Sequence, residues 1–296
     1  MKDKLIYVII KGNNTLAEAF FMKKKIKELL ESEGILLFGI CSLADCNITK
    51  EYLLEKAGIR SGSAILFAIP YFSEDSLLKE RNISAYAVCK DYHAYTKQLF
   101  KRLESELSSS FPENRFAFFA DHSPIDERDA AVKCGIGFFG KNRLLISNAY
   151  SSYMFIAEII TDAALTPTLP LSDLECIGCG KCLSACPMNA DGSPECLSAI
   201  TQKKGALSDG EVALMKKYNT FWGCDICQEV CPHTKKAIES GSIFSPIAYF
   251  SEDTTPHLTV PLIEGMNDEE FSKRAYSWRG KQVLLRNLLY SDDHVL

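Results

Sequence analysis

The stretch CIGCGKCLSACP, residues 176–187, places four cysteines close together and follows the last one with proline. This spacing is typical of proteins with two 4Fe–4S clusters, in which three thiolates of the run bind one cluster and the fourth binds the other. A partner motif is therefore required. CDICQEVCP, residues 224–232, supplies three further cysteines, and Cys196 brings the number to eight. We assign one cluster to Cys176, Cys179, Cys182 and Cys231, and the other to Cys186, Cys196, Cys224 and Cys227.

Structural zinc is the alternative, because zinc sites also use paired C-x2-C motifs. Repeated C-x2-C spacing that ends in Cys-Pro, in two related motifs, favours iron–sulfur clusters. A disulfide framework is not expected, since such frameworks belong to short secreted chains. We interpret the remaining four cysteines as small buried residues or inert thiols: Cys41, Cys46, Cys89 and Cys134.

The composition is that of an ordinary globular protein, with 296 residues, 47% hydrophobic and 24% charged. No apolar run reaches the roughly 18 residues that a membrane-spanning helix needs, and the first residues lack a signal-peptide cleavage site, so we expect a cytoplasmic protein with no membrane partner. The net charge of −5 provides no overall field that attracts polyanions. A nucleic-acid partner would have to meet a local basic patch.

Compact apolar runs of strand length alternate with helical patterns over residues 1–165, which predicts an α/β domain. One amphipathic helix is expected at 14–33 and a long one at about 83–109. The expected strands are 35–41, 64–71, 115–121, 143–147 and 153–160.

A stretch with two prolines, TPTLPLSD, residues 166–173, suits a linker. We therefore expect an α/β cofactor and substrate domain at 1–165 and a ferredoxin-like (α+β) double-cluster domain at 166–240. A short helical tail at 241–296, with a helix at 268–290, would pack on the rest. Paired cubane clusters carry single electrons, so the reactive site is expected in the first domain.

The densest polar constellation in that domain lies at 118–147. Asp121 lies at the C-terminal end of a predicted strand, where a general acid could face a substrate. The alternative is that Asp121 caps the helix that follows. Lys141 and Asn142, in the sequence GKN, could hold phosphate or amide groups of a cofactor, although no nucleotide P-loop or Rossmann fingerprint is present.

Several stretches together resemble a known family. They occur in one order, and the order is more specific than any single motif: AYAVCKDYHAYTKQLFKRL (85–103), DHSPIDERDAAVKCGIGFFGKN (121–142), YMFIAEIITD (153–162), the two cysteine motifs, CLSAIT (196–201) and WRGKQVLLRNL (278–288). The chain is similar to the cobalamin-dependent epoxyqueuosine reductases, which are related to reductive dehalogenases. It looks like a short member that lacks the C-terminal helical-repeat module.

The resemblance implies an oxidoreductase that converts epoxyqueuosine to queuosine in a tRNA anticodon. Two 4Fe–4S clusters would reduce a cobalamin in the first domain, and a low-potential donor such as a flavodoxin or ferredoxin would supply the electrons. Asp121 aligns with the proton donor of the family, because opening an epoxide leaves an alkoxide that must be protonated. By the same alignment the corrin would contact Lys141, Asn142, Leu145, Ile156 and Ser198.

Two alternative functions remain open at this stage. One is an iron–sulfur electron-transfer protein without corrin, and the other is a cobalamin-dependent reductase of a small molecule. A basic stretch near the C-terminus could touch tRNA phosphates or could be a solvated helix face; it contains Lys273, Arg274, Arg279, Lys281 and Arg286.

Overall fold

A computed structural model describes residues 2–169, 175–189 and 195–291, with side chains described from residue 17 onward. Its internal contacts divide the chain into two compact units, each built from three stretches. Unit 1 comprises Met1–Ile69, Thr96–Phe138 and Phe155–Leu174, and unit 2 comprises Pro70–Tyr95, Phe139–Met154 and Glu175–Leu296. None of the helices in the described part of the chain combines the length and hydropathy that a bilayer crossing requires.

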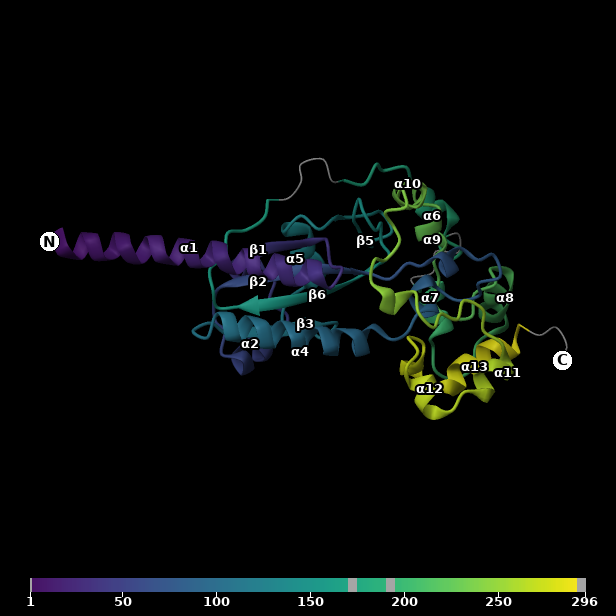
Figure 1. Ribbon diagram of the computed structural model, residues 1–296. Coiled ribbons are helices and arrows are strands. Elements are labelled where there is room, and N and C mark those ends of the chain that lie inside the picture. The colour runs from purple at the N-terminus through teal and green to yellow at the C-terminus, as the bar shows by residue number, and fades with distance from the viewer. Residues whose placement is uncertain (1, 170–174, 190–194, 292–296) are drawn as a thin grey trace. The chain divides into compact units, whose positions relative to one another are not determined.

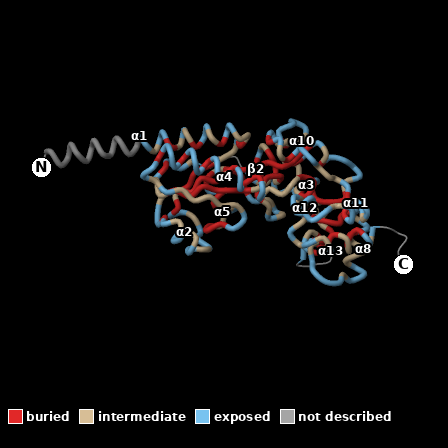
Figure 2. The backbone as a smooth tube through the Cα atoms, turned by 60° about the horizontal axis from the view of Figure 1, so that its bottom comes forward, coloured by how far each residue is buried: buried red, intermediate tan, exposed pale blue. Residues whose placement is uncertain are grey.

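The centre of unit 1 is a four-stranded sheet in the order β1-β2-β6-β3. β1 (Phe38–Ser42) pairs antiparallel with β2 (Ser63–Pro70), and β3 (Phe116–Ala120) pairs antiparallel with β6 (Met154–Thr161). All residues of β2 are buried, as the continuous apolar run SAILFAIP predicts for a central strand. Figure 2 shows β2 in the colour of buried residues, whereas the residues of β3 are half-buried.

Helices of unit 1 pack around this sheet. α1 (Lys2–Ser32) and α4 (Tyr92–Ser110) lie side by side, joined by an ion pair between Lys25 and Glu106 at 3.0 Å. α1 runs well beyond the sheet at its N-terminal end (Figure 1). α5 (Glu127–Lys133) contacts β1, where Gly39 allows a close approach: a Cβ there would lie 2.2 Å from the Cys134 carbonyl oxygen. The unit also contains α2 (Glu51–Ala57) and the 3-10 turn η1 (Leu43–Asp45).

Unit 2 is mainly helical. Its longer helices are α8 (Asp209–Lys217), α10 (Pro232–Glu239) and α13 (Lys281–Leu289). The shorter helices are α3 (Ala85–Val88), α6 (Lys181–Ala185), α7 (Leu197–Thr201), α9 (Ile226–Glu229), α11 (Val260–Gly265) and α12 (Asp268–Ser272). The 3-10 turns are η2 (Glu74–Leu77), η3 (Ala248–Phe250) and η4 (Ser277–Arg279). A two-stranded sheet pairs β4 (Phe138–Phe139) with β5 (Leu145–Ile146), and Phe138 of β4 is counted with unit 1.

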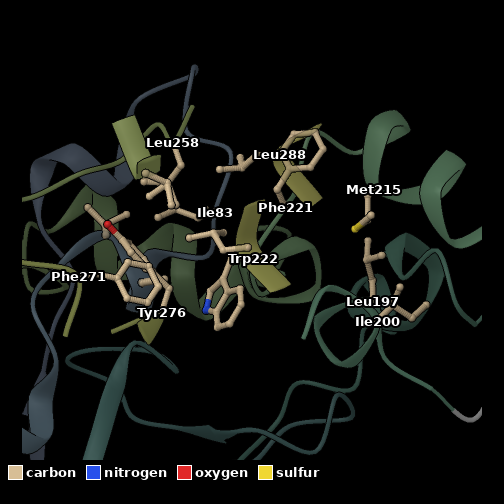
Figure 3. Packing of buried hydrophobic residues seen from close by; sticks show 14 of the residues in the cluster. Ile83, Leu197, Ile200, Met215, Phe221, Trp222, Leu258, Phe271, Tyr276 and Leu288 are labelled. Atoms are coloured by element: carbon tan, nitrogen blue, oxygen red, sulfur yellow. The ribbon is translucent and has the colours of Figure 1, made fainter. Parts of the chain in front are cut away.

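One apolar core joins the cysteine region to the C-terminal residues. Trp222 is fully buried and lies among Ile83, Phe221 and Tyr276 (Figure 3). The same cluster contains side chains from the stretch before β3, from the helices that follow the cysteines and from the tail: Val88, Leu197, Ile200, Met215, Leu258, Ile263, Phe271, Leu284 and Leu288. Because of this shared core, residues 241–291 belong to unit 2 and do not form a separate unit.

The units differ from the three contiguous ranges expected from the sequence. Residues 70–95 group with the cysteine region because they bond to it; for example, the Ser84 amide donates to the Trp222 carbonyl at 2.7 Å. The predicted linker nevertheless ends where the last stretch of unit 2 begins, at Glu175. In the described residues of 175–240 the structure has helices and no strand, unlike the expected α+β pattern.

Two long helices predicted from the sequence are interrupted. The helix expected at 83–109 consists of α3 and α4, because Asp91 accepts the main-chain N–H of His93 at 2.9 Å and thereby starts a new helix. The helix expected at 268–290 is divided into α12, η4 and α13 around Gly280, whose φ of 89° lies outside the helical region. The first predicted helix is confirmed, and it begins earlier than expected, at Lys2.

Candidate metal centres and candidate acid site

The four thiols assigned to the first cluster line one cavity in unit 2, although Cys231 is far from the other three in sequence: Cys176, Cys179, Cys182 and Cys231. Cys231 caps the N-terminus of α10 with Pro232 at the first helical position. The donor set is therefore four sulfurs around a common space, which is the ligation that a 4Fe–4S cluster requires. In the described part of the chain, no three His, Cys, Asp or Glu side chains are grouped for a single metal ion.

Two glycines shape the loop that carries these thiols. Gly178 and Gly180 have φ values of 72° and 73°, in the left-handed region that residues with a Cβ rarely adopt. Lys141, which also lines the cavity, fixes the loop, since its Nζ donates to the Gly178 carbonyl at 2.8 Å. The alternation of cysteine and glycine in CIGCGK thus turns the chain around the cavity.

The thiols assigned to the second cluster lie within electrostatic range of one another. Burial raises the pKa of Cys224 to about 12 and that of Cys227 to about 11; the Cys196 thiol adds to both shifts, and the Cys186 thiol adds to the second. A thiol with a raised pKa stays protonated near neutral pH, whereas the form that binds a metal is the thiolate. Loading this site should therefore release protons.

A buried carboxylate holds the loop between Cys224 and Cys227. The Asp225 side chain is 2% exposed and accepts from Arg81 Nη1 at 2.8 Å. Three further donors surround it, namely the Ser84 hydroxyl, the Ala85 amide at 2.6 Å and the Gln228 side-chain amide at 2.9 Å. Sequence reasoning missed this anchor. In the sequence, the signal for a buried Asp225 was its place inside CDIC, between two residues that face a core.

The residues expected to contact a corrin are distributed over both units. Lys141 holds the Gly178 loop, and the Asn142 side chain hydrogen-bonds to the Cys227 thiol. Ser198 lies on α7 and receives a bond from the Gln202 amide at 3.3 Å. Leu145 is buried on β5 in unit 2, whereas Ile156 is buried on β6 in unit 1. The observed contacts are with the protein and the cysteine loops, and a role of these residues in corrin binding stays a prediction.

Asp121 lies directly after β3 in an unusual turn. Its φ is 66°, and the His122 amide donates to the Ala120 carbonyl at 2.7 Å, a bond that spans two residues. These are the features of a classic γ-turn, which is rare and strained in proteins. Strained backbone is concentrated at functional sites. The side chain is exposed.

The capping alternative for Asp121 is wrong. The N-cap of α5 is Asp126, whose carboxylate accepts the Asp129 amide at 3.2 Å. The β1–β2 and β3–β6 pairs are antiparallel, so the rule that ligands gather at the carboxyl ends of parallel strands does not apply to them. The case for a functional Asp121 therefore depends on the γ-turn in which it lies.

Next to Asp121, the His122 ring is fixed from both sides. Its Nδ1 lies 3.3 Å from the Lys50 ammonium and its Nε2 lies 2.9 Å from the Tyr52 hydroxyl. An ammonium group can only donate, so Nδ1 accepts and the proton of the neutral ring is on Nε2, which donates to Tyr52. The ring is therefore a positioned part of the loop.

Two glutamates, one buried and one half-buried, lie near this loop, and sequence reasoning missed both. Glu158, on β6, is completely buried, and Glu127 is the first residue of α5. One carboxylate oxygen of each, Oε2, is buried without a hydrogen-bond partner. Burial is the largest cause that raises the pKa of both groups, well above the ordinary range for Glu158 and to about 7 for Glu127.

Family models match both halves of this arrangement. A model described as "Epoxyqueuosine reductase QueG, DUF1730" matches residues 56–122, which end at the γ-turn, and a model described as "4Fe-4S double cluster binding domain" matches residues 175–234, which contain all eight assigned cysteines. The epoxyqueuosine reductase of Bacillus subtilis is 32% identical over 95% of this chain and 74% of its own length. This chain belongs to the epoxyqueuosine reductase family.

Other members show the same extent of similarity. The epoxyqueuosine reductase of Listeria monocytogenes is 31% identical over 93% of this chain and 74% of its own length. That of Lactococcus garvieae is 32% identical over 68% of this chain and 58% of its own length. This reductase chain thus spans between about three fifths and three quarters of these relatives.

Solved structures of epoxyqueuosine reductases have the same fold. One, with an epoxyqueuosine-modified tRNA-Tyr stem loop, aligns with a TM-score of 0.73 at 27% identity, covering 92% of this chain and 81% of that one. The Streptococcus thermophilus enzyme aligns with a TM-score of 0.70 at 26% identity, covering 91% and 80%. The chain is therefore an oxidoreductase of this family with a double 4Fe–4S domain.

In this reductase the basic stretch near the C-terminus makes mainly internal contacts. Lys281 donates to the Met266 carbonyl at 2.6 Å and Arg286 to the Lys203 carbonyl at 2.8 Å, so both satisfy main-chain groups. Arg274 pairs with Asp253 at 2.8 Å. Trp278, 56% exposed, is covered on one face by the Arg279 guanidinium at 4.1 Å. Most of these cations therefore stabilise the tail itself.

Proposed function

We propose that this chain reduces epoxyqueuosine in tRNA to queuosine, with Asp121 as the proton donor and the eight assigned cysteines as ligands of two 4Fe–4S clusters. The observation that carries the proposal is the cavity lined by Cys176, Cys179, Cys182 and Cys231, which combines both cysteine motifs in a member of this family. The tRNA anticodon is the proposed partner because a relative was solved with a modified tRNA stem loop.

The proposed reaction determines which electrons and protons the protein has to supply. Converting an epoxide to an alkene consumes two electrons and two protons and releases the oxygen as water. Clusters that carry one electron each can supply the electrons in sequence. Asp121 would protonate the oxygen as its bond to carbon breaks, which is general acid catalysis. In one Bacillus subtilis epoxyqueuosine reductase structure, a catalytic loop named for its aspartate is swung out of the active site, which supports a mobile aspartate loop in the family.

The electrons are proposed to come from a low-potential flavodoxin or ferredoxin. One cysteine of each assigned set, Cys179 and Cys196, is exposed, so both clusters would lie close to the surface of unit 2. A cytoplasmic location is part of the proposal, because thiols and reduced clusters persist in a reducing compartment.

Cobalamin is a further part of the proposal and rests on the family resemblance. It would supply a cobalt centre that accepts electrons from the clusters and reduces the substrate. Lys141, Asn142, Leu145, Ile156 and Ser198 remain the proposed contacts. The test is to reconstitute the clusters, add cobalamin without oxygen, and measure cobalt and the corrin absorption after gel filtration. Full cluster loading with no retained corrin would remove cobalamin from the proposal.

Turnover tests the function itself. The reconstituted chain is incubated without oxygen with an epoxyqueuosine-modified tRNA-Tyr stem loop and a low-potential reductant, and the nucleosides are analysed by mass spectrometry. We expect loss of one oxygen atom from the modified base. Asp121→Asn should abolish product while the cluster spectra stay unchanged, and Asp45→Asn, an exposed aspartate of the same unit, should retain activity.

Two results would contradict the proposal. A fully loaded wild-type chain that makes no queuosine would favour the electron-transfer alternative. A fully active Asp121→Asn variant would remove this residue from the mechanism while leaving the reductase assignment in place.

A further inference from the structure

The short turn between β4 and β5 contacts both sets of assigned cysteines. The tip of this turn, residues 140–142, lines the cavity formed by the thiols of the first set. From the same turn, the Asn142 side chain hydrogen-bonds to the Cys227 thiol, which belongs to the second set. The turn and both sets of cysteines lie in unit 2. One short segment therefore reaches the ligands of both proposed clusters.

Main-chain bonds hold this turn in a defined shape. The Gly140 amide donates to the Leu144 carbonyl at 2.9 Å, and the Arg143 amide donates to the Gly140 carbonyl at 2.9 Å. A Cβ at position 140 would lie 2.5 Å from Oδ1 of Asn142, so a larger residue there would displace the asparagine side chain. The turn thus presents Lys141 and Asn142 from a fixed backbone.

Lys141 brings a positive charge to the first cavity. Although the residue is exposed, its Nζ is held at 2.8 Å from the Gly178 carbonyl, in the loop between Cys176 and Cys179. Among the residues that the structure describes, no carboxylate pairs with this ammonium. Reduction adds one negative charge to a cluster, so a cation beside the ligand loop stabilises the reduced form.

Asn142 meets the second set as a hydrogen-bond donor. Its Oδ1 accepts the Leu144 amide at 3.3 Å, which leaves the side-chain NH2 group to donate to the Cys227 sulfur. Hydrogen bonds to ligand sulfur are among the features that set the potentials of iron–sulfur clusters. Because sulfur carries more negative charge after reduction, a donor there also stabilises the reduced form. The two side chains thus act in the same direction on different sets.

We propose that the turn at residues 140–144 tunes the reduction potentials of both clusters, with Lys141 raising that of the first and Asn142 that of the second. This inference rests on the proposed function, in which the clusters carry the electrons. Each cluster accepts one electron at a time from the donor and passes it on. The two side chains change how readily the low-potential donor reduces each cluster, and in this role they act as positioning residues that do not touch the substrate.

The experiment measures reduction potentials in the full chain with both clusters and without corrin, so that a lost corrin contact cannot explain a change. The chain is titrated anaerobically, and reduction is followed by visible absorbance and electron paramagnetic resonance. Lys141→Gln and Asn142→Asp should each lower the ratio of reduced to oxidised cluster at a given potential by at least about threefold. This change equals about 28 mV, because a tenfold change corresponds to about 59 mV for one electron.

Chains with a single cluster assign each change. Cys186→Ser keeps the four ligands of the first set, and Cys231→Ser keeps those of the second. Lys141→Gln should lower the potential mainly in the Cys186→Ser chain, and Asn142→Asp mainly in the Cys231→Ser chain. Asn142→Asp keeps an oxygen that accepts the Leu144 amide, so the turn itself should persist. Iron content should match that of the parent chain.

Three further variants separate tuning from a structural role. Lys141→Arg keeps the charge and the donor, and should keep the wild-type potential. Gly140→Ala removes no polar group but displaces Asn142, so it should lower the same potential as Asn142→Asp. Lys181→Gln removes an exposed charge next to Cys182. It should lower the first potential less than Lys141→Gln, because solvent and salt screen a charge that is not held against the loop.

Unchanged potentials in Lys141→Gln and Asn142→Asp at full iron content would overturn the inference, as would equal changes of both clusters in each variant. An effect of Lys181→Gln as large as that of Lys141→Gln would overturn the part assigned to Lys141. If Asn142→Asp loses its cluster, Gly140→Ala decides the part assigned to Asn142. A wild-type chain that makes no queuosine contradicts the proposed function alone, because the titrations need no substrate.

Discussion

Arg81 and Asp225 are 144 residues apart in the chain and form a buried ion pair, with Nη1 of the arginine 2.8 Å from Oδ2 of the aspartate. The aspartate lies between two assigned ligands of the second cluster. A segment that precedes the sheet strand β3 therefore holds the loop that has to present Cys224 and Cys227. The geometry of the proposed metal centre depends on this distant contact.

Breaking this pair should be costly. Asp225→Ala leaves the Arg81 guanidinium buried without its main partner, and removing one member of a buried pair destabilises proteins by about 3–5 kcal/mol. Denaturant unfolding of the cluster-free chain measures the change. Glu229→Gln is the control, because Glu229 also contacts Arg81 but is 51% exposed and should contribute less than about 1 kcal/mol. Equal effects of the two substitutions would show that Asp225 is not the anchor.

Serine substitutions test how the cysteines are divided between clusters. The wild-type chain should hold about eight irons, as two cubane clusters require. Cys231→Ser and Cys186→Ser should each retain about four, and the spectra of the two remaining clusters should differ because different sets survive. Cys89→Ser, at a buried thiol outside both sets, should leave the iron content unchanged. Zinc in place of iron, in anaerobically prepared protein, would refute the assignment.

The γ-turn predicts a pattern of stability that is separate from activity. Asparagine and glycine tolerate a positive φ, whereas alanine at 66° should destabilise the fold by about 1–2 kcal/mol. We therefore expect Asp121→Ala to unfold at lower denaturant concentration than Asp121→Asn or Asp121→Gly. All three should lose the proton donor. If the alanine variant is as stable as wild type, the turn is not strained in solution.

Glu158 should make the fold less stable as the pH rises. Burial raises its pKa well above 4.5, so the folded chain keeps a proton that the unfolded chain releases above that pH. The unfolded state then binds fewer protons, and the free energy of unfolding falls from about pH 4.5 upward until the folded-state pKa is reached. Glu158→Gln should remove this part of the decline. Thermal unfolding of both chains over the pH range measures it, and parallel pH profiles would contradict the prediction.

Local patterns in the sequence predicted much of unit 1 and the grouping of the first four thiols. RFAFFAD predicted β3, which ends at Ala120 just before Asp121, because aromatic and small apolar residues there are bounded by charges. The cysteine spacing indicated which thiols meet, because a cluster turn has a fixed geometry. The single acidic residue in the apolar run YMFIAEII is the local signal for the buried Glu158.

Other features depend on partners that are distant in sequence. Lys90, between α3 and α4, bridges to Arg274, and no periodicity in the sequence marks that point. The link between Lys141 and Gly178 is also invisible locally. For this reason the sequence predicts only that Lys141 could hold a cofactor. The structure shows its side chain hydrogen-bonded to the loop that carries the first cysteines.

Because unit 2 is built from three separated stretches, its maturation has to wait for most of the chain. Arg81 and Ser84 leave the ribosome early and remain without Asp225 until much later in synthesis. Iron insertion is thus expected to follow translation. A piece cut after the two prolines would contain all eight assigned cysteines but not the arginine that orders one of their loops, so we do not expect this cysteine region to fold as a separate module.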